Sequence, residues 1–281
     1  MKEIGFYPGC SLEGTSREYN ESVQALARHF SLPLKEIEDW NCCGASAAHA
    51  LNHDLALALP ARILALAEAQ GMEEVVVPCA ACFGRLATTQ YKLAHDEELR
   101  KHICNIIQMP YQGKLKILNV LQWTEQYIKP LLTQVPHPLQ KKVACYYGCL
   151  LIRPHKILQF DRVENPQSMD ELARLCGSEP IDWAFKTECC GAGLSISRTE
   201  SVGRLSGDIL SDASDRGAEA VIVACPMCHS NLDMRRPAAN RYLGKELDLP
   251  VLFITQLIGL SLGISRKELG LDRHFVPVPE W

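Results

Sequence analysis

One arrangement of five cysteines occurs twice in this chain of 281 residues, and it limits the possible folds more than any other feature. In the first copy a single cysteine is followed after 31 residues by a vicinal pair, and after 35 more by a Cys-x-x-Cys motif. In the second copy these intervals are 39 and 34 residues. The two sets are Cys10, Cys42, Cys43, Cys79 and Cys82, and then Cys149, Cys189, Cys190, Cys225 and Cys228. A chain that repeats its motifs in order is expected to repeat its fold.

The segments around the cysteines repeat as well. Three blocks recur at offsets of 139, 147 and 146 residues: 3–10 with 142–149, 41–45 with 188–192, and 75–82 with 221–228. The two copies join near residues 132–142, where Pro136 and Pro138 interrupt any regular element. The sequence therefore predicts two cysteine-rich domains, residues 1–135 and residues 139–281.

Short β-branched runs alternate with helical patterns in each copy. Val75–Val77 and Val221–Val223 are continuous apolar runs of the kind found in buried parallel strands. The alternation predicts an α/β fold of two tandem, pseudo-symmetric domains, each a small, mostly parallel sheet flanked by helices. Ligands of such sheets bind at the carboxyl ends of the strands. In each copy the single cysteine and the Cys-x-x-Cys motif fall directly after a predicted strand.

Helical patterns are expected over Ser22–Phe30, Met169–Cys176 and most of Ala45–Gln70. We expect Pro60 to break the last of these or to open a new first turn, because proline is best tolerated at the start of a helix.

Composition excludes several classes of protein. The net charge of −4 leaves no broad basic field, so nucleic-acid binding is not expected. The richest aliphatic stretch, Leu51–Ala69, contains Asp54 and Arg62 and is a poor membrane span, and the start of the chain lacks the apolar run of a signal peptide. We therefore predict a cytoplasmic protein whose cysteines stay reduced unless they bind metal or do redox chemistry.

The five-cysteine set suits a metal–sulfide cluster. A Cys-x-x-Cys turn after a strand brings two thiolates to one metal centre, and the glycines after the vicinal pairs, Gly44 and Gly191, allow close backbone approach. Tetrahedral zinc is the competing interpretation, but it takes four thiolates and leaves the fifth unexplained. An iron–sulfur cluster offers several metal atoms to a larger set. Cys104, Cys145 and Cys176 have no counterpart in the other copy and are expected to be packing residues.

Three blocks closely resemble the B subunit of heterodisulfide reductase, of the cysteine-rich CCG-domain family. They are residues 7–13 (Tyr-Pro-Gly-Cys-Ser-Leu-Glu), 38–45 (Glu-Asp-Trp-Asn-Cys-Cys-Gly-Ala) and 147–154 (Tyr-Gly-Cys-Leu-Leu-Ile-Arg-Pro). The resemblance covers essentially the whole chain. Its one departure is the interval between Cys190 and Cys225, which is one residue shorter than usual and is easily absorbed by a surface loop.

The resemblance implies two [4Fe–4S] clusters of the non-cubane type, one per domain, each held by the five cysteines of its set. It implies that a small-molecule disulfide is clamped between the clusters and split into two thiols, or formed in reverse. It also implies two partners in the complex, a ferredoxin-like iron–sulfur subunit, called C, and a flavin-containing subunit, called A. Two electrons are needed to open one disulfide, which suits two one-electron carriers.

The chain has no ferredoxin cysteine run and no GxGxxG motif, so electrons are expected to come from a partner. The alternative function is that of a non-catalytic electron-transfer subunit in another CCG-domain complex, of the lactate, glycolate or sulfur-metabolism type. A zinc-bearing scaffold protein is the third possibility.

Three further residues are candidates for roles beside the clusters. His229 directly follows Cys228 and is placed to support a ligand. Arg153 is expected on a loop lining the site, where it would bind an acidic group of the substrate. His49 follows the first vicinal pair and would supply a hydrogen bond or a proton. Ordinary surface roles for Arg153 and His49 are the competing interpretation.

Overall fold

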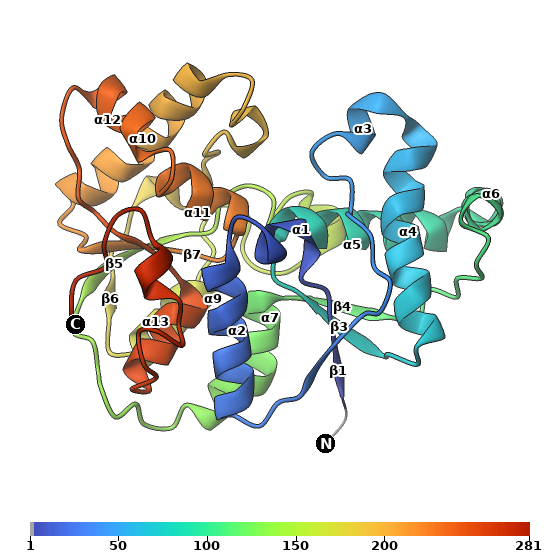
Figure 1. The fold of residues 1–281 in the computed structure, drawn as a ribbon, viewed down its shortest axis with the longest axis horizontal. Helices are drawn as coiled ribbons and strands as arrows, with labels where there is room; N and C mark the ends of the chain where they lie inside the picture. The colour runs from blue at the N-terminus through green and yellow to red at the C-terminus, as the bar shows by residue number, and fades with distance from the viewer. Residues whose placement is uncertain (1–2) are drawn as a thin grey trace.

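The computed structural model describes residues 3–281 and contains two four-stranded parallel sheets flanked by helices (Figure 1). The first sheet has the order β2-β1-β3-β4, and its strands are Leu34–Glu36, Ile4–Phe6, Glu74–Val77 and Lys116–Asn119. The second has the order β6-β5-β7-β8, with strands Glu179–Pro180, Lys142–Tyr146, Ala220–Val223 and Val251–Phe253. The predicted fold class, two repeated parallel α/β sheets, is confirmed.

The two sheets share one topology, since the strand order is the same when the second is counted from β5. The central strands β3 and β7 carry the β-branched runs, and every residue of β7 is buried. Covering helices on both faces explain why these strands are apolar throughout rather than alternating.

Helices connect the strands in both halves. In the first half they are α1 Gly9–Glu13, α2 Arg17–His29, α3 Ala48–Leu51, α4 His53–Ala69, α5 Ala80–His95, α6 Glu97–Ile107 and α7 Val120–Trp123. In the second half they are α8 His155–Leu158, α9 Ser168–Leu175, α10 Thr199–Asp215, α11 Pro226–Leu232, α12 Arg236–Leu243 and α13 Ile254–Ser261. Single turns of other types follow α7 at Thr124–Ile128 and Lys129–Leu131, and lie at Ala184–Thr187, Ala192–Leu194 and Leu271–Arg273.

The expected break at Pro60 is wrong. Pro60 lies inside α4, and the helical segment is interrupted instead at Asn52, whose side chain accepts a hydrogen bond from the backbone N–H of Leu55 and caps the helix. Apolar side chains of α4 are buried before and after the proline, at Leu57 and Leu64 among others. Their burial compensates for the one backbone hydrogen bond that proline cannot make.

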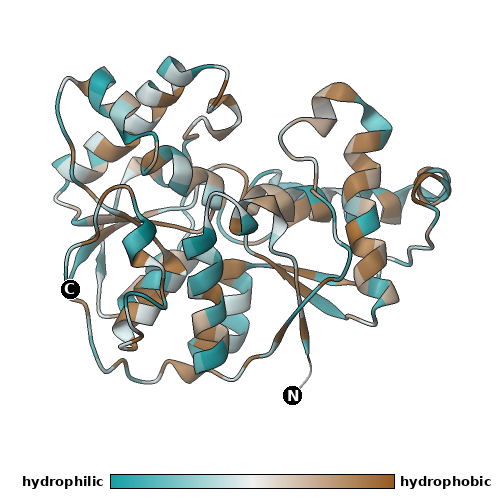
Figure 2. Cartoon of the chain, in the orientation of Figure 1, coloured by the Kyte–Doolittle hydropathy of each residue, from teal (hydrophilic) through white to brown (hydrophobic). Residues whose placement is uncertain are grey.

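The two halves share a hydrophobic core. Helix α2 of the first half packs beside α13 of the second, as Figure 1 shows, and Tyr19 stacks on Phe253 with ring centroids 3.9 Å apart. Ser22 and Thr255 hydrogen-bond across the same contact at 2.7 Å. Apolar residues are concentrated on the central strands and inner helix faces, while the solvent side of α2 is hydrophilic (Figure 2).

Within residues 3–281, none of the helices is both long and apolar enough to span a bilayer.

Candidate functional site

Each half delivers its cysteines from the carboxyl ends of its central strands. Cys10 follows β1 and Cys79 follows β3, and the equivalents Cys149 and Cys225 follow β5 and β7. Cys79 is the N-cap residue of α5, and Cys225 is that of α11. Neither helix start has a side-chain cap, so its first backbone N–H groups and the positive end of its dipole favour anionic sulfur nearby.

The structure brings the first set of five cysteines together. The Sγ atoms of Cys43 and Cys82 lie 3.1 Å apart, and those of Cys10 and Cys42 lie 4.0 Å apart. The hydrogen bond with Cys82 lowers the pKa of the Cys43 thiol to about 7 against the opposing effect of burial. The backbone N–H of Gly44 donates to the Cys42 sulfur at 3.5 Å. A lowered thiol pKa favours the thiolate, which is the form that binds metal.

The second set repeats this arrangement. The Cys149 and Cys189 thiols hydrogen-bond to each other, and this interaction lowers the pKa of Cys189 to about 6. Gly191 donates its backbone N–H to the Cys189 sulfur at 3.3 Å, as Gly44 does in the first set. Cys190 interacts with Cys228, the counterpart of the pair formed by Cys43 and Cys82.

The two sets meet at the Cys-x-x-Cys motifs. The buried thiols of Cys79 and Cys225 interact directly across the boundary between the halves. Beneath them the fully buried Tyr19 hydroxyl lies 3.4 Å from the carbonyl oxygen of Pro78 and 3.3 Å from that of Ala224. One hydroxyl therefore bridges the residues that immediately precede the two motifs.

Glycine at two positions makes room for the cysteines. Gly9 and Gly148 have φ of 65° and 66°, in the region that side chains with a Cβ rarely adopt. A Cβ at Gly9 would lie 3.2 Å from the Cys82 sulfur, and one at Gly148 would lie 2.9 Å from the Cys228 sulfur. Both cysteine sets thus depend on the absence of a side chain one residue before their first member.

Two tyrosines have a positioning role that we did not predict from the sequence. The Tyr7 hydroxyl donates to the carbonyl of Asn41 at 2.8 Å, and the Tyr146 hydroxyl donates to that of Glu188 at 2.6 Å. Each carbonyl belongs to the residue before a vicinal cysteine pair. The repeated tyrosine three residues before Cys10 and Cys149 was a signal available in the aligned repeats.

A cleft of 460 Å³ opens between the halves beside the cysteines. All five cysteines of the first set line it. From the second half it is lined by Ala192 and Gly193, just after the second vicinal pair, and by Pro226 and Met227 within the second Cys-x-x-Cys motif. Among the residues that line the cleft there is no cysteine of the second set, so the two sets differ in their access to a ligand.

Arg235 is the one charged side chain among the residues lining this cleft, and we did not predict it. Its Nε–H donates to the Ser195 hydroxyl at 3.3 Å. Met227, Ser230, Asn231, Met234 and Arg235 all line the cleft at spacings of three or four residues. The spacing from Met227 is helical only to the end of α11 at Leu232, and Arg235 lies beyond that end, so periodicity alone gave no signal for it.

The three supporting residues predicted from the sequence lie elsewhere. His229 is buried behind Cys228, and its Nε2–H donates to the carbonyl of Val251 at 3.0 Å. Arg153 is exposed, and neither residue lines the cleft. His49 lies in α3, but its side chain is outside the described part of the structure. Roles for these residues beside a cluster stay predictions.

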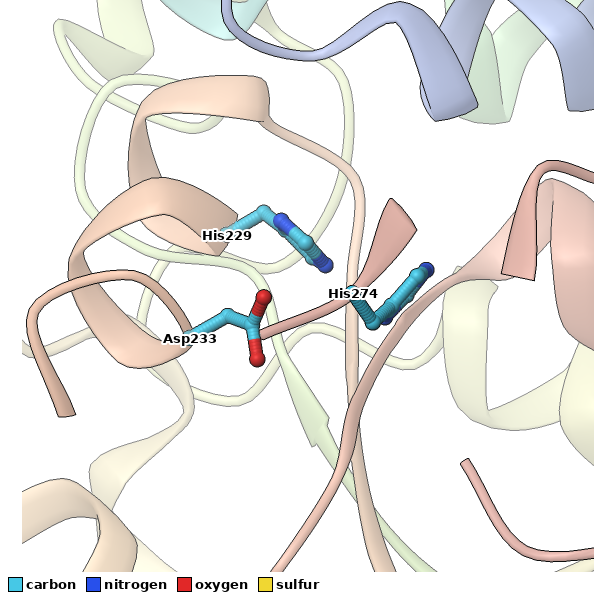
Figure 3. Close-up of side chains that lie close together, drawn as sticks. All are labelled: His229, Asp233 and His274. Atoms are coloured by element: carbon cyan, nitrogen blue, oxygen red, sulfur yellow. The ribbon is translucent and has the colours of Figure 1, made fainter. Parts of the chain in front are cut away.

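His229, Asp233 and His274 form a second group of metal-ligating types, shown in Figure 3, with ligand atoms within 4.8 Å of one another. Their hydrogen bonds indicate a structural role. The Gln256 amide donates to Nε2 of His274, which leaves the ring proton on Nδ1 of the neutral imidazole.

Both Asp233 oxygens are also occupied, because they accept the backbone N–H groups of Phe275 and Val276 at 2.8 and 2.9 Å. Through these hydrogen bonds the group fastens the C-terminal tail to α11.

The donor sets fit an iron–sulfur centre. Each set gathers five cysteine sulfur atoms, one more than tetrahedral zinc takes, and encloses them with glycine backbone and helix N-termini. Two joined α/β domains with such sets define a class of protein, the two-domain cysteine-rich redox proteins.

The model of the CCG cysteine-rich domain matches residues 4–87 and 143–233. The chain therefore belongs to the CCG cysteine-rich domain family, with one copy of the domain in each half.

Full-length relatives agree with this assignment. The chain is 33% identical to the 8-methylmenaquinol:fumarate reductase membrane anchor subunit of Wolinella succinogenes, over 98% of both chains. It is 28% identical to the B subunit of the ferredoxin/F420H2-dependent CoB-CoM heterodisulfide reductase of Methanosarcina acetivorans, over 98% of this chain and 94% of that one. These relationships support an iron–sulfur oxidoreductase subunit.

Comparison with solved structures supports the fold. A hypothetical protein from Helicobacter pylori matches with a TM-score of 0.82 at 14% identity, over 99% of this chain and 52% of that chain. The match covers about half of that protein's length, and at this identity the likeness shows the fold alone.

Proposed function

We propose that this chain is the disulfide-reducing subunit of a heterodisulfide reductase-like complex, with one non-cubane [4Fe–4S] cluster on each five-cysteine set. The observation that carries the proposal is the meeting of two such sets at Cys79 and Cys225, next to a cleft that residues of both halves line and that the first set reaches directly. Opening a disulfide takes two electrons, and two adjacent one-electron centres supply that number. The likeness to the B subunit of heterodisulfide reductase supports the same reaction.

The reaction converts R–S–S–R′, two electrons and two protons into R–SH and R′–SH. When bound, the clusters supply the electrons and the iron that accepts a thiolate sulfur. The chain's own residues position the substrate in the cleft: Met227 and Ile196 offer apolar contact, and Arg235 offers a charged hydrogen-bond donor at one end. Hydroxyl groups of the lining, such as Ser230, are placed to pass protons from solvent to the departing thiolates.

The electrons come from a partner, because the chain itself has no cysteine run for a relay cluster and no nucleotide-binding glycine motif. We propose the ferredoxin-like iron–sulfur subunit, C, as the direct donor and the flavin-containing subunit, A, behind it. The second relative is by name one subunit of a heterodisulfide reductase, which supports a multisubunit assembly.

Metal analysis of protein purified without oxygen tests the cluster assignment. Two [4Fe–4S] clusters require about eight iron and about eight acid-labile sulfide per chain. Stoichiometric zinc with no iron would contradict the proposal. Cys43→Ser and Cys190→Ser are matched variants at equivalent positions, and each is expected to remove one cluster and leave the other. A variant pair that keeps full iron would exclude these cysteines as ligands.

A second function is favoured by one relative. The membrane anchor protein of 8-methylmenaquinol:fumarate reductase matches over the full chain, which supports an electron-transfer role linked to a quinol instead of a disulfide. Adding a disulfide, a thiol or a soluble menaquinol analogue to the clusters, each in turn, separates the functions. A thiol-bound paramagnetic state supports the disulfide reaction. Cluster reduction by the quinol with no response to any thiol or disulfide would favour the electron-transfer role.

A further inference from the structure

A buried ring of three residues joins the two segments that carry Cys149 and Cys189. Lys186 and Asp170 form an ion pair of 2.8 Å, and their side chains are only 4% and 2% exposed. The Tyr147 hydroxyl donates to the other carboxylate oxygen of Asp170 at 2.7 Å. The ring closes through the main chain, because the carbonyl of Lys186 accepts the backbone N–H of Tyr147 at 2.8 Å. Tyr147 lies two residues before Cys149, and Lys186 lies three residues before Cys189.

Each of the three side chains in this ring has at least two hydrogen-bond partners. The ammonium group of Lys186 also donates to the carbonyl of Pro166 at 3.1 Å. The hydroxyl of Tyr147 also accepts the backbone N–H of Met169 at 2.7 Å, at the start of α9. A buried polar network whose members are all satisfied is rigid and defines one arrangement of the chain. The ring therefore fixes both cysteine-bearing segments to α9.

The first half has no counterpart of this ring. In the aligned repeats Pro8 takes the place of Tyr147, and Asp39 takes the place of Lys186. Proline has no backbone N–H, so the main-chain hydrogen bond that closes the ring cannot form there. Asp39 pairs instead with Arg62 of α4, and these two side chains are 77% and 32% exposed. Exposed ion pairs restrain a chain only weakly, so the two halves hold their vicinal cysteines by different means.

The burial of the ion pair indicates positioning rather than a gain in stability. The cost of taking two charges out of water often exceeds their attraction, and replacing both charges together is frequently neutral. Separating the two charges is strongly unfavourable, because each is then buried without a partner. The ion pair of Lys186 and Asp170 thus disfavours arrangements in which the Cys149 turn moves away from the segment before Cys189.

We propose that Lys186 is a positioning residue for the second cluster, acting through Asp170 and Tyr147 to fix the spacing of Cys149 and Cys189. This inference rests on the proposed function, because it requires a cluster on the second cysteine set. None of the three ring residues lines the cleft, so they act on the cluster through the backbone that carries its ligands. The second cluster alone is expected to depend on the ring.

Removal of the ion pair tests this role in the full chain purified without oxygen. Lys186→Met leaves the Asp170 carboxylate buried and unpaired, so we expect lower stability in urea and a fall from about eight to about four iron per chain. Lys186→Met combined with Asp170→Asn leaves no unpaired charge. The double variant should regain most of the stability and still lack the second cluster, which a purely structural role would not predict.

Tyr147→Phe is the milder change, because it keeps the ion pair and removes one hydroxyl. We expect it to retain about eight iron and to shift the electron paramagnetic resonance signal of the second cluster only. The Cys43→Ser and Cys190→Ser variants assign each signal to its domain. Lys129→Met is the matched control: Lys129 pairs at 2.7 Å with Glu171, next to Asp170 on α9, but at the surface. Its removal is expected to change neither signal.

The outcomes separate the inference from the proposed function. A double variant with wild-type iron content and an unshifted second signal would overturn the positioning role of Lys186. A Tyr147→Phe protein with both signals unchanged would do the same, as would a double variant that loses both clusters equally. A wild type without iron would instead contradict the proposed function.

Discussion

Gly148 shows how closely single atoms limit the cysteine sets. Its φ of 66° already costs a residue with a Cβ about 1–2 kcal/mol. The added carbon would also lie 2.9 Å from the Cys228 sulfur. We therefore expect Gly148→Ala to destabilise the fold and to displace Cys228, so that the protein keeps only the iron of the first set.

Gly217→Ala is the matched control for Gly148→Ala. Gly217 has φ of 79°, and a Cβ there would meet nothing within 4 Å. It should cost similar stability in urea unfolding and leave the iron content unchanged. Equal iron in both variants would show that the contact with Cys228 does not matter.

A single hydrogen bond of the Tyr146 hydroxyl is also expected to matter for the second cysteine set. This hydroxyl donates to the carbonyl of Glu188, directly before the second vicinal pair. Tyr146→Phe leaves that carbonyl without its partner, which typically costs about 1–3 kcal/mol. We expect slower rebuilding of the second cluster from iron and sulfide, while the first cluster forms at the wild-type rate. Tyr7→Phe should slow the rebuilding of the first cluster and leave the second at the wild-type rate. Variants that affect both clusters equally would refute a local role for these hydroxyls.

Among helices and strands, those that occur in both repeats were predicted from the sequence. Features that depend on tertiary contacts were not. The β-branched runs before both Cys-x-x-Cys motifs are the central strands, because continuous apolar residues suit only a sheet covered on both faces. The position of Pro60 inside α4 was not predictable from local preference, since burial on both sides outweighs one lost hydrogen bond.

The residues that line the cleft were also hard to predict, because their position depends on tertiary contacts. Arg235 lies beyond the last residue of α11 and becomes a lining residue only because the halves close against each other.

The C-terminal tail is an element whose attachment should depend on pH. Burial, with the nearby His229, holds the pKa of His274 down to about 3, against about 6.5 in an unfolded chain. Between these values the unfolded chain binds a proton that the folded chain does not, so stability falls as the pH drops. The slope for one proton is about 1.4 kcal/mol per pH unit.

The titration of Glu18 has the opposite effect on the pH dependence of stability. Burial raises its pKa from 4.5 to about 7, so it favours the folded state as the pH falls through that range. Comparing wild type with His274→Gln by urea unfolding at pH 7, 6 and 5 isolates the histidine. The variant should lose less stability on acidification than the wild type, and parallel pH profiles would contradict the assignment.

The whole molecule is less divided than its repeats suggest. Predicted boundaries at residues 135 and 139 separate the two sheets in sequence, yet α2 of the first half packs on α13 of the second. A shared core makes the spacing between the cysteine sets a property of the folded chain rather than of a flexible linker. Electron exchange between two centres requires such fixed spacing, and the contact between Cys79 and Cys225 depends on it.

Tyr19 is the residue where this arrangement is most directly testable. Its hydroxyl reaches the carbonyls of both Pro78 and Ala224, while its ring stacks on Phe253. Tyr19→Phe keeps the stack and leaves two buried carbonyls short of a donor, at a cost of about 1–2 kcal/mol. We expect the two Cys-x-x-Cys motifs to separate slightly, which weakens the magnetic coupling between the reduced clusters.

Electron paramagnetic resonance of the fully reduced protein measures that coupling, and iron analysis confirms that both clusters are present. Tyr242→Phe removes a hydroxyl from an exposed ring and serves as the control, with coupling and stability as in the wild type. A Tyr19→Phe protein with unchanged coupling and unchanged stability would show that the shared core alone sets the spacing. Weaker coupling with intact clusters would show that the Tyr19 hydroxyl on α2 fixes the distance between the two centres.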